Sequence, residues 1–237
     1  MNNAQQKKGS GMQVPKEANI YVNTPISRPV YVHLETPDAF KDGDTPKFKM
    51  TQLFPKDTDL SEVSKAIQSC IQVMRDNNPI WKGLQLHEIK TPILDGDRKF
   101  QELVVEKGED KAQTFWKGNY YLVPTSQYQP ACYELVTKTN EDNSPVLVDG
   151  KPVKEKLTID PKKVYSGCLA QAYICVYPYK SGTTYGITTR LMSVRFVGNA
   201  AKINTGGSKG SEWDGVQDDN LPEWAKQAMT QTDDIPF

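Results

Sequence analysis

Apolar and polar residues alternate along several short stretches of the chain, which is the pattern of half-buried β-strands. Residues 28–35 (RPVYVHLE) and 46–50 (PKFKM) alternate in this way. The first stretch places Tyr31 on its outer face, and the second places Lys47 and Lys49 there. The first stretch is predicted to direct three apolar side chains to one face, those of Val30, Val32 and Leu34.

The two longest strand patterns lie late in the chain. Residues 164–179 (VYSGCLAQAYICVYPY) carry small or aliphatic residues at even positions, such as Cys168, Ala170, Ala172, Ile174 and Val176. The odd positions display tyrosines, namely Tyr165, Tyr173, Tyr177 and Tyr179. Residues 186–197 (GITTRLMSVRFV) alternate as well, but the apolar positions change parity between Leu191 and Met192. This change predicts a β-bulge.

One segment, residues 60–75, has a clear helical period. Asp59 and Glu62 have the spacing of a capping box, and the sequence DNNP ends the segment. Its apolar stripe is interpreted as core packing and consists of Val63, Ile67, Cys70, Ile71 and Met74.

Residues 81–127 give a mixed signal, with turn residues in LDGD and EKGED and a strand expected at 119–123. Further strands are predicted at 131–137 and 146–153, the latter as a hairpin folded over Asp149-Gly150. Many short strands, one helix and turns rich in glycine and proline predict a mainly β protein. The favoured architecture is a small closed or partly open barrel with a long insertion, and a sandwich stays open as an alternative.

Charge is strongly segregated along the chain, although the formal net charge is zero. Seven acidic residues and one lysine follow from residue 212 onward, so this segment has a net charge of −6 and the remainder +6. A stretch containing glycine and serine precedes the acidic segment and is interpreted as a linker. We expect the acidic segment itself to be disordered apart from a helical turn.

Several classes of protein are disfavoured by composition. No apolar run is long enough for a membrane span, and the polar start of the chain favours a protein that is not exported. The four cysteines are scattered without a CxxC pair, and neither histidine has a cysteine nearby, so we expect buried, reduced thiols. We expect no cofactor, no metal and no membrane partner.

Catalytic motifs are also missing from the sequence, which contains no P-loop, no GxSxG and no HExxH. The acidic pair Asp95 and Asp97 could join a metal site for phosphodiester cleavage. DGD is also an ordinary turn sequence, and no third ligand is close by in the sequence. A metal-dependent nuclease is therefore retained only as an alternative.

Binding of single-stranded nucleic acid requires basic side chains for the backbone and exposed aromatic rings for the bases. The outer positions of the predicted strands supply both, and a second aromatic-basic group lies in FWKGNYYLVP. The candidate DNA-binding residues are Tyr31, Lys47, Lys49, Trp116, Lys117, Tyr173, Tyr177, Tyr179, Lys180, Arg190 and Arg195.

The chain ends on TDDIPF, two carboxylates followed by an apolar tip. The terminal ring fits a hydrophobic pocket on a partner, and the acids favour a basic surface around that pocket. The whole acidic segment can also compete with DNA for the basic body of the same chain. The candidate partner-binding residues are Asp233, Asp234, Ile235, Pro236 and Phe237.

TDDIPF resembles the tip of bacterial single-stranded-DNA-binding proteins, which recruits replication and repair proteins. The body resembles a family of bacteriophage single-stranded-DNA-binding proteins, chiefly in VYSGCLAQAYICVYPY and YGITTRLMSVRFVGNA. This resemblance implies an OB fold, no catalysis and little sequence preference. The residues that match the family pattern have a structural character and are Tyr165, Gly167, Gly186, Leu191, Val194 and Phe196. The early helix and the long 81–127 stretch depart from the usual OB arrangement.

The resulting domain prediction is a flexible arm (1–18), an OB-fold DNA-binding domain (19–199), a linker (200–211) and an acidic protein-interaction tail (212–237). The leading hypothesis is a phage protein that coats and protects single-stranded DNA during replication or recombination and recruits partners through its tail. It would act in the cytoplasm of the infected bacterium, associated with the nucleoid when bound to DNA, and homo-oligomerisation stays open. A second alternative is an adaptor whose tail binds host proteins while the body binds no DNA.

Overall fold

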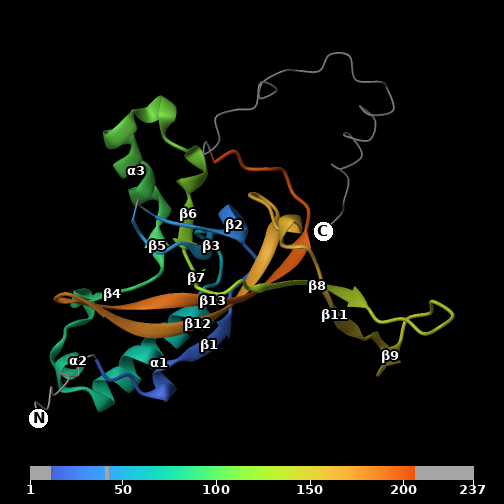
Figure 1. Cartoon of the computed structure of the whole chain (residues 1–237), viewed down its shortest axis with the longest axis horizontal. Coiled ribbons are helices and arrows are strands. Elements are labelled where there is room, and N and C mark those ends of the chain that lie inside the picture. Colours follow the sequence, from blue (N-terminus) through green and yellow to red (C-terminus); the bar gives the residue numbers. More distant parts are fainter. Residues whose placement is uncertain (1–11, 41–42, 206–237) are drawn as a thin grey trace, which may run out of the picture. The chain divides into compact units, whose positions relative to one another are not determined.

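The computed structural model describes residues 12–40 and 43–205, all within one compact unit (Figure 1). The first eleven residues of the predicted arm, residues 206–211 of the linker and the whole predicted tail lie outside the described residues. The larger sheet has eleven strands. They are β1 (Ile20–Asn23), β2 (Arg28–Asp38), β3 (Lys47–Pro55), β4 (Ile89–Lys90), β5 (Leu94–Asp95), β6 (Asn119–Leu122), β7 (Thr125–Ser126), β8 (Ala131–Thr137), β11 (Lys154–Thr158), β12 (Leu169–Ser181) and β13 (Thr184–Gly198).

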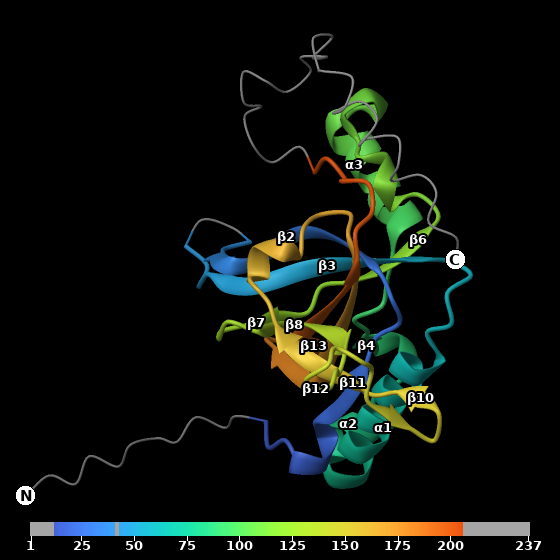
Figure 2. The same cartoon turned by 90° about the vertical axis from the view of Figure 1, so that its right-hand side faces the viewer.

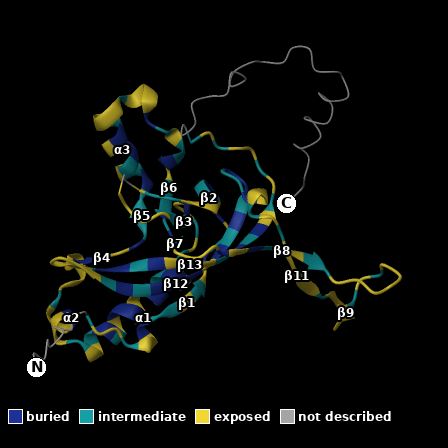
Figure 3. Cartoon of the chain, in the orientation of Figure 1, coloured by how far each residue is buried: buried dark blue, intermediate teal, exposed yellow. Residues whose placement is uncertain are grey.

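The predicted late strands are confirmed as the antiparallel pair β12 and β13, the longest strands of the sheet. The even positions 170, 172, 174 and 176 are fully buried, and Figure 3 shows the resulting alternation along both strands. Cys175 departs from the alternation because it is buried at an odd position. The strand begins five residues later than predicted, since residues 164–168 do not belong to β12.

The predicted β-bulge in the last strand is confirmed. Tyr173 pairs with Ser193, and the next residue, Ile174, pairs with Leu191, so Met192 is the extra residue. Leu191 and Val194 are both buried although they are three residues apart, which a regular strand does not allow.

The sheet curls because β13 changes partners along its second edge. It runs parallel to β4, β7 and β8 in turn, and β7 continues to β3. β3 pairs with β2, and the start of β2 returns to β12 through a bridge between Ser27 and Ala170. The strands therefore form the curled, mainly β, OB-like fold that the sequence predicts.

The predicted helix is confirmed as α1 (Ser61–Asn77), which lies beside β1 and β12 (Figure 1). All members of its predicted apolar stripe are buried. Its capping differs from the prediction, because Asp59 accepts a hydrogen bond from the Ser61 N–H (2.8 Å) while Glu62 pairs with Lys65. A short helix, α2 (Pro79–Gly83), follows α1 and buries Trp81.

The prediction of a single helix is wrong, because residues 81–127 contain α3 (Gly96–Lys107). Its N-cap is Asp95, whose carboxylate accepts hydrogen bonds from the N–H groups of Asp97 and Arg98, and its C-cap is Gly108 with φ of 90°. Phe100 and Leu103 pack into a second, smaller core. Figure 2 shows α3 at the opposite end of the body from α1. The remaining short helical turns are η1 (Lys16–Ala18), η2 (Leu86–Glu88), η3 (Glu109–Lys111), η4 (Thr114–Trp116) and η5 (Pro161–Lys163).

The predicted alternation of residues 28–35 is broken at Tyr31. Its φ is 51°, in the left-handed region, and the pairing of β2 with β3 shifts by one residue between Val30 and His33. Val30 therefore packs in the smaller core, while Val32 and Leu34 pack in the main one. The prediction that these three residues share one face is wrong.

β8 and β11 form a two-stranded ribbon that extends away from the body (Figure 1). Beyond it, β9 (Leu147–Val148) and β10 (Lys151–Pro152) form the predicted hairpin over Asp149 and Gly150, whose φ values of 50° and 73° suit a type I′ turn.

Both ends of the described chain are held to the body. The Trp81 indole N–H donates to the Met12 sulfur (3.2 Å), within the predicted arm. Tyr165 Oη and the Ala200 backbone exchange hydrogen bonds, and Ile203 N–H donates to Ser166 O. Residues 200–203, predicted as linker, are thus part of the folded body.

Candidate nucleic-acid interface

The outer surface of β12 and β13 brings together most of the predicted DNA-binding residues. Tyr173, Tyr177 and Tyr179 lie at alternate positions of β12, and Arg190 and Arg195 lie on β13 opposite Cys175 and Gln171. Lys47, at the start of β3, lines a hollow together with Tyr177 and Arg190. We call these six residues the tyrosine face.

Three hollows follow the tyrosine face along the strands. The first is lined by Tyr179, Tyr177, Lys47 and Lys90, and the second by Tyr177, Lys47, Arg190 and Met192. The third, past the bulge, is lined by Tyr173 and Arg195. The first two share Lys47, Thr125 and Tyr177, so they are continuous.

The bulge at Met192 determines which residues reach this surface. Arg190 and Arg195 are five residues apart, and a regular strand would direct them to opposite faces. The bulge takes Met192 out of the alternation, so both arginines lie on the same face, where Arg190 lines the second hollow and Arg195 the third.

The tyrosine rings are supported by specific neighbours. The Arg190 guanidinium lies 5.0 Å from the Tyr177 ring centroid, and Tyr173 stacks on Tyr21 of β1 at 5.9 Å. Tyr179 pairs with Gly186, where a Cβ atom would lie 2.6 Å from the tyrosine ring. A side chain at position 186 would therefore displace this ring.

Three contributors were not predicted from the sequence. Tyr133 and Lys156 lie on the ribbon and line the third hollow, with the Lys156 ammonium 4.7 Å from the Tyr133 ring centroid. Tyr128, which is 81% exposed, lines the second hollow from the loop after β7. Tyr128 and Tyr133 are single aromatic residues in their stretches, and Lys156 alternates with Glu155 in a stretch of mixed charge. Only the tertiary arrangement places them beside the tyrosine face.

The basic groups on this surface have no acidic partner among the residues that the structure describes. Within the described part of the chain, Lys47, Lys90, Lys156, Arg190 and Arg195 form no ion pair. The Arg195 Nε atom is buried and has no hydrogen-bond partner there. Unpaired cations beside exposed rings are the combination that binds a phosphate backbone and its bases.

Four predicted residues lie away from the tyrosine face, around α3 and the β2–β3 pair. Lys49 is only 6% exposed, and its ammonium pairs with Asp38 at 2.7 Å, so the expectation of an exposed lysine is wrong. Trp116 is 5% exposed and packs in the smaller core, with Tyr31 stacked on it at 6.2 Å. Burial raises the pKa of Tyr31. Lys117 lies 4.1 Å from the Phe100 ring centroid.

Lys180, the remaining predicted residue, lies near the β12–β13 turn. Its ammonium is 5.4 Å from the centroid of the Tyr185 ring, and the residue is exposed. It is therefore close in sequence to the tyrosine face but lines none of the three hollows described above.

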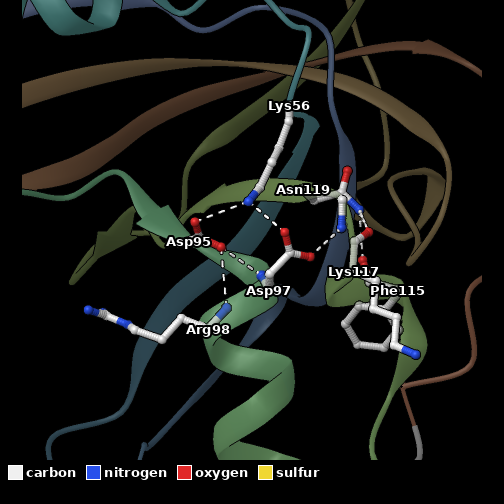
Figure 4. A network of polar contacts seen from close by, with 8 residues as sticks. Lys56, Asp95, Asp97, Arg98, Phe115, Lys117 and Asn119 are labelled. Carbon is white, nitrogen blue, oxygen red and sulfur yellow. Dashed lines mark hydrogen bonds and ion pairs between the residues drawn. The ribbon is translucent and has the colours of Figure 1, made fainter.

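The acidic pair considered for metal-dependent cleavage is bound to a lysine instead (Figure 4). Lys56 Nζ lies 3.1 Å from Asp95 Oδ2 and 2.5 Å from Asp97 Oδ2, and Asp97 also accepts from the Gly118 N–H at 2.7 Å. The hydrogen bonds from Lys56 lower the pKa of both carboxyl groups. Within residues 12–40 and 43–205, no three His, Cys, Asp or Glu side chains are grouped to hold a metal ion. The pair fixes the start of α3 against β3 and β6.

None of the described helices is both long and apolar enough to cross a membrane.

Solved structures of a phage single-stranded-DNA-binding protein have a fold similar to this one. The single-stranded-DNA-binding protein from bacteriophage Enc34, in complex with ssDNA, has a similar fold, with a TM-score of 0.53 and 18% sequence identity. That alignment covers 84% of this chain and 100% of the Enc34 chain. A C-terminal truncation of the Enc34 protein gives a TM-score of 0.51 and 22% identity, covering 77% of this chain and 87% of the other. A comparison with curated proteins gave no match. Residues 20–222 match the family described as the ssDNA-binding protein of Enterobacter phage Enc34, and the chain belongs to this family.

Proposed function

We propose that this protein binds single-stranded DNA along the tyrosine face, without catalysis and with little sequence preference. The observation that carries the proposal is the row of tyrosines on β12 beside arginines and lysines that have no acidic partner in the described structure. Stacking on tyrosine is tolerant of base identity because every base has a π-face. Membership of the Enc34 family and the similarity to an Enc34 protein in complex with ssDNA support the same function.

The biological role that suits this chemistry is the coating and protection of single strands during phage replication or recombination, in the cytoplasm of the infected host. We propose that the acidic segment from residue 212 has two functions. Its net charge of −6 competes with DNA for the basic body, and its tip, Asp233 to Phe237, recruits replication or repair proteins.

The test is a fluorescence titration with oligo-dT at low and high salt, for the full chain and for a chain truncated after Gly210. We expect the full chain to bind, and the truncation to tighten binding most at low salt, because charge competition is strongest there. An increase in affinity that is independent of salt would contradict the masking role of the tail.

The adaptor hypothesis makes the opposite prediction for the body. If neither form binds single strands while the tail still binds host proteins, the proposed DNA-binding function is wrong. Incubation of labelled DNA with Mg²⁺ or Mn²⁺ tests the nuclease alternative, and intact DNA at high protein excess would remove it.

A further inference from the structure

A second aromatic cleft lies between α3 and the β2–β3 pair. It has a volume of about 450 Å³, and we call it the α3 cleft. Its aromatic lining comes from Tyr31, Phe40, Trp116 and Tyr121, and Lys99 and Lys107 of α3 lie at its wall. Trp116 and Tyr121 pack edge to face at 4.8 Å, so the inner wall is held rigidly.

The α3 cleft adjoins the tyrosine face. Val123, between β6 and β7, lines both the α3 cleft and the hollow that contains Tyr177 and Tyr179. A strand bound along β12 and β13 can therefore continue across Val123 without leaving the protein surface.

The groups in the α3 cleft suit a nucleotide. Phe40 is 58% exposed and presents a ring to solvent at the cleft, while the Lys49 ammonium lies 3.9 Å from the ring centroid on the protein side. Trp116 is only 5% exposed and forms part of the inner aromatic wall of the cleft.

The charge of the α3 cleft also favours a phosphate. The Asp38 carboxylate is neutralised by Lys49 at 2.7 Å, and hydrogen bonding from that lysine lowers its pKa. Lys107 forms no ion pair in the described structure, and Lys99 has only a 3.7 Å contact with Glu102. The lysines of α3 thus supply charge next to an aromatic wall.

We propose that the α3 cleft is a second DNA subsite, which takes a nucleotide of the same single strand after it has passed the tyrosine face. This inference rests on the proposed function. It also accounts for the separation of the sequence-predicted residues, because Tyr31, Lys49 and Trp116 line this cleft rather than the tyrosine face. The subsite would be filled only by strands long enough to span both surfaces.

The test compares Phe40→Ala, Phe40→Trp and Lys107→Gln with the native full chain on oligo-dT of about 4 to about 30 nucleotides. Phe40 is exposed and Lys107 lies at the helix surface, so these changes leave both cores intact. We expect Phe40→Ala to weaken binding of long strands roughly five-fold or more, and short strands not at all. Phe40→Trp should retain the affinity, and the matched change Lys82→Gln on α2 should have no effect at any length.

Photo-crosslinking with bromodeoxyuridine provides an independent readout. A base analogue toward one end of a long strand should crosslink to peptides containing Phe40 or Tyr121, and a short strand should not. Native affinity at every length for Phe40→Ala and Lys107→Gln would overturn the subsite while leaving the tyrosine face in place. Tighter binding by these variants would assign the cleft to the acidic tail instead, and absence of binding by the native chain would overturn both proposals.

Discussion

Tyr173 provides the most direct test of the tyrosine face. Its side chain is partly exposed (37% for the residue), and its strand neighbours Ala172 and Ile174 form the buried face beneath it. Replacement by alanine therefore removes a stacking platform while leaving the core unchanged, at a stability cost below about 1 kcal/mol from lost cross-strand contact.

The loss of DNA affinity expected for Tyr173→Ala depends on the neighbouring ring of Tyr21. Stacking contributes about 1–3 kcal/mol per base, equivalent to roughly five- to 150-fold in affinity. Tyr21 stacks on Tyr173 at 5.9 Å and is itself 51% exposed, so it can still support a base after Tyr173 is removed. We expect Tyr173→Ala alone to reduce the affinity by roughly five-fold. The double variant, Tyr21→Ala with Tyr173→Ala, should reduce it by up to roughly 150-fold.

The assay is an oligo-dT titration repeated over a range of salt concentrations. A stacking residue carries no charge, so Tyr173→Ala should lower affinity equally at all salt concentrations, and Tyr173→Phe should retain it. Arg195→Gln should behave differently, because each phosphate contact on a single strand changes the slope of log K against log salt by about 0.7. The assignment of these residues would be refuted if Tyr173→Ala changed the salt slope or if Arg195→Gln left it unchanged.

Three further predictions concern the fold that supports this surface. Gly186→Ala should weaken oligonucleotide binding without altering the salt slope, because a Cβ atom 2.6 Å from the Tyr179 ring displaces it; circular dichroism checks that the variant folds. Burial raises the pKa of the Cys70 thiol to about 12 and that of Cys132 to about 11, so the native protein should resist alkylation at pH 8, with all four thiols reacting after denaturation. Burial also lowers the pKa of His33, so the unfolded chain binds its proton more readily and the melting temperature should fall as pH drops below about 6.5; His33→Gln should reduce this decline.

The strand pattern and the main helix were predictable because each depends on local periodicity. The parity of residues 170–176 predicted the buried face of β12, and the parity change at Leu191 and Met192 predicted the bulge. The Asp149-Gly150 turn followed from the same local chemistry.

The sequence does not predict α3 because its capping residues also favour a turn. Asp95 belongs to LDGD, a common turn sequence, but in the structure its carboxylate caps a helix. Phe100, Leu103 and the closing Gly108 were a usable signal for that helix. The tight contact at Gly96, where a Cβ atom would lie 2.2 Å from Trp116 O, was not predictable because its partner is twenty residues away in sequence.

The site was only partly predictable for a related reason. The odd or even position of a residue in a strand indicates which face of the sheet its side chain lies on. It does not indicate whether another part of the chain covers that face. Lys49 alternates with apolar residues along β3, as an outward-facing residue would. It is nevertheless buried against Asp38 and Phe40. Tyr133 and Lys156 lie beside the tyrosine face only because the first residues of β8 pair with β13.

The bulge connects the fold to the proposed function more closely than any single contact. Arg190 and Arg195 are separated by an odd number of positions, so a continuous strand would expose one and bury the other. Leu191 and Val194 are also an odd number of positions apart and are both buried, and the bulge, which takes Met192 out of the alternation, accommodates both pairs. Deleting Met192 would leave Arg190 and Arg195 four positions apart and Leu191 and Val194 two positions apart, which is the spacing of a regular strand. We therefore expect both the deletion and Met192→Ala to retain the fold, as judged by thermal melting curves, and to bind oligo-dT. Loss of folding or of binding by the deletion alone would contradict this explanation of the bulge.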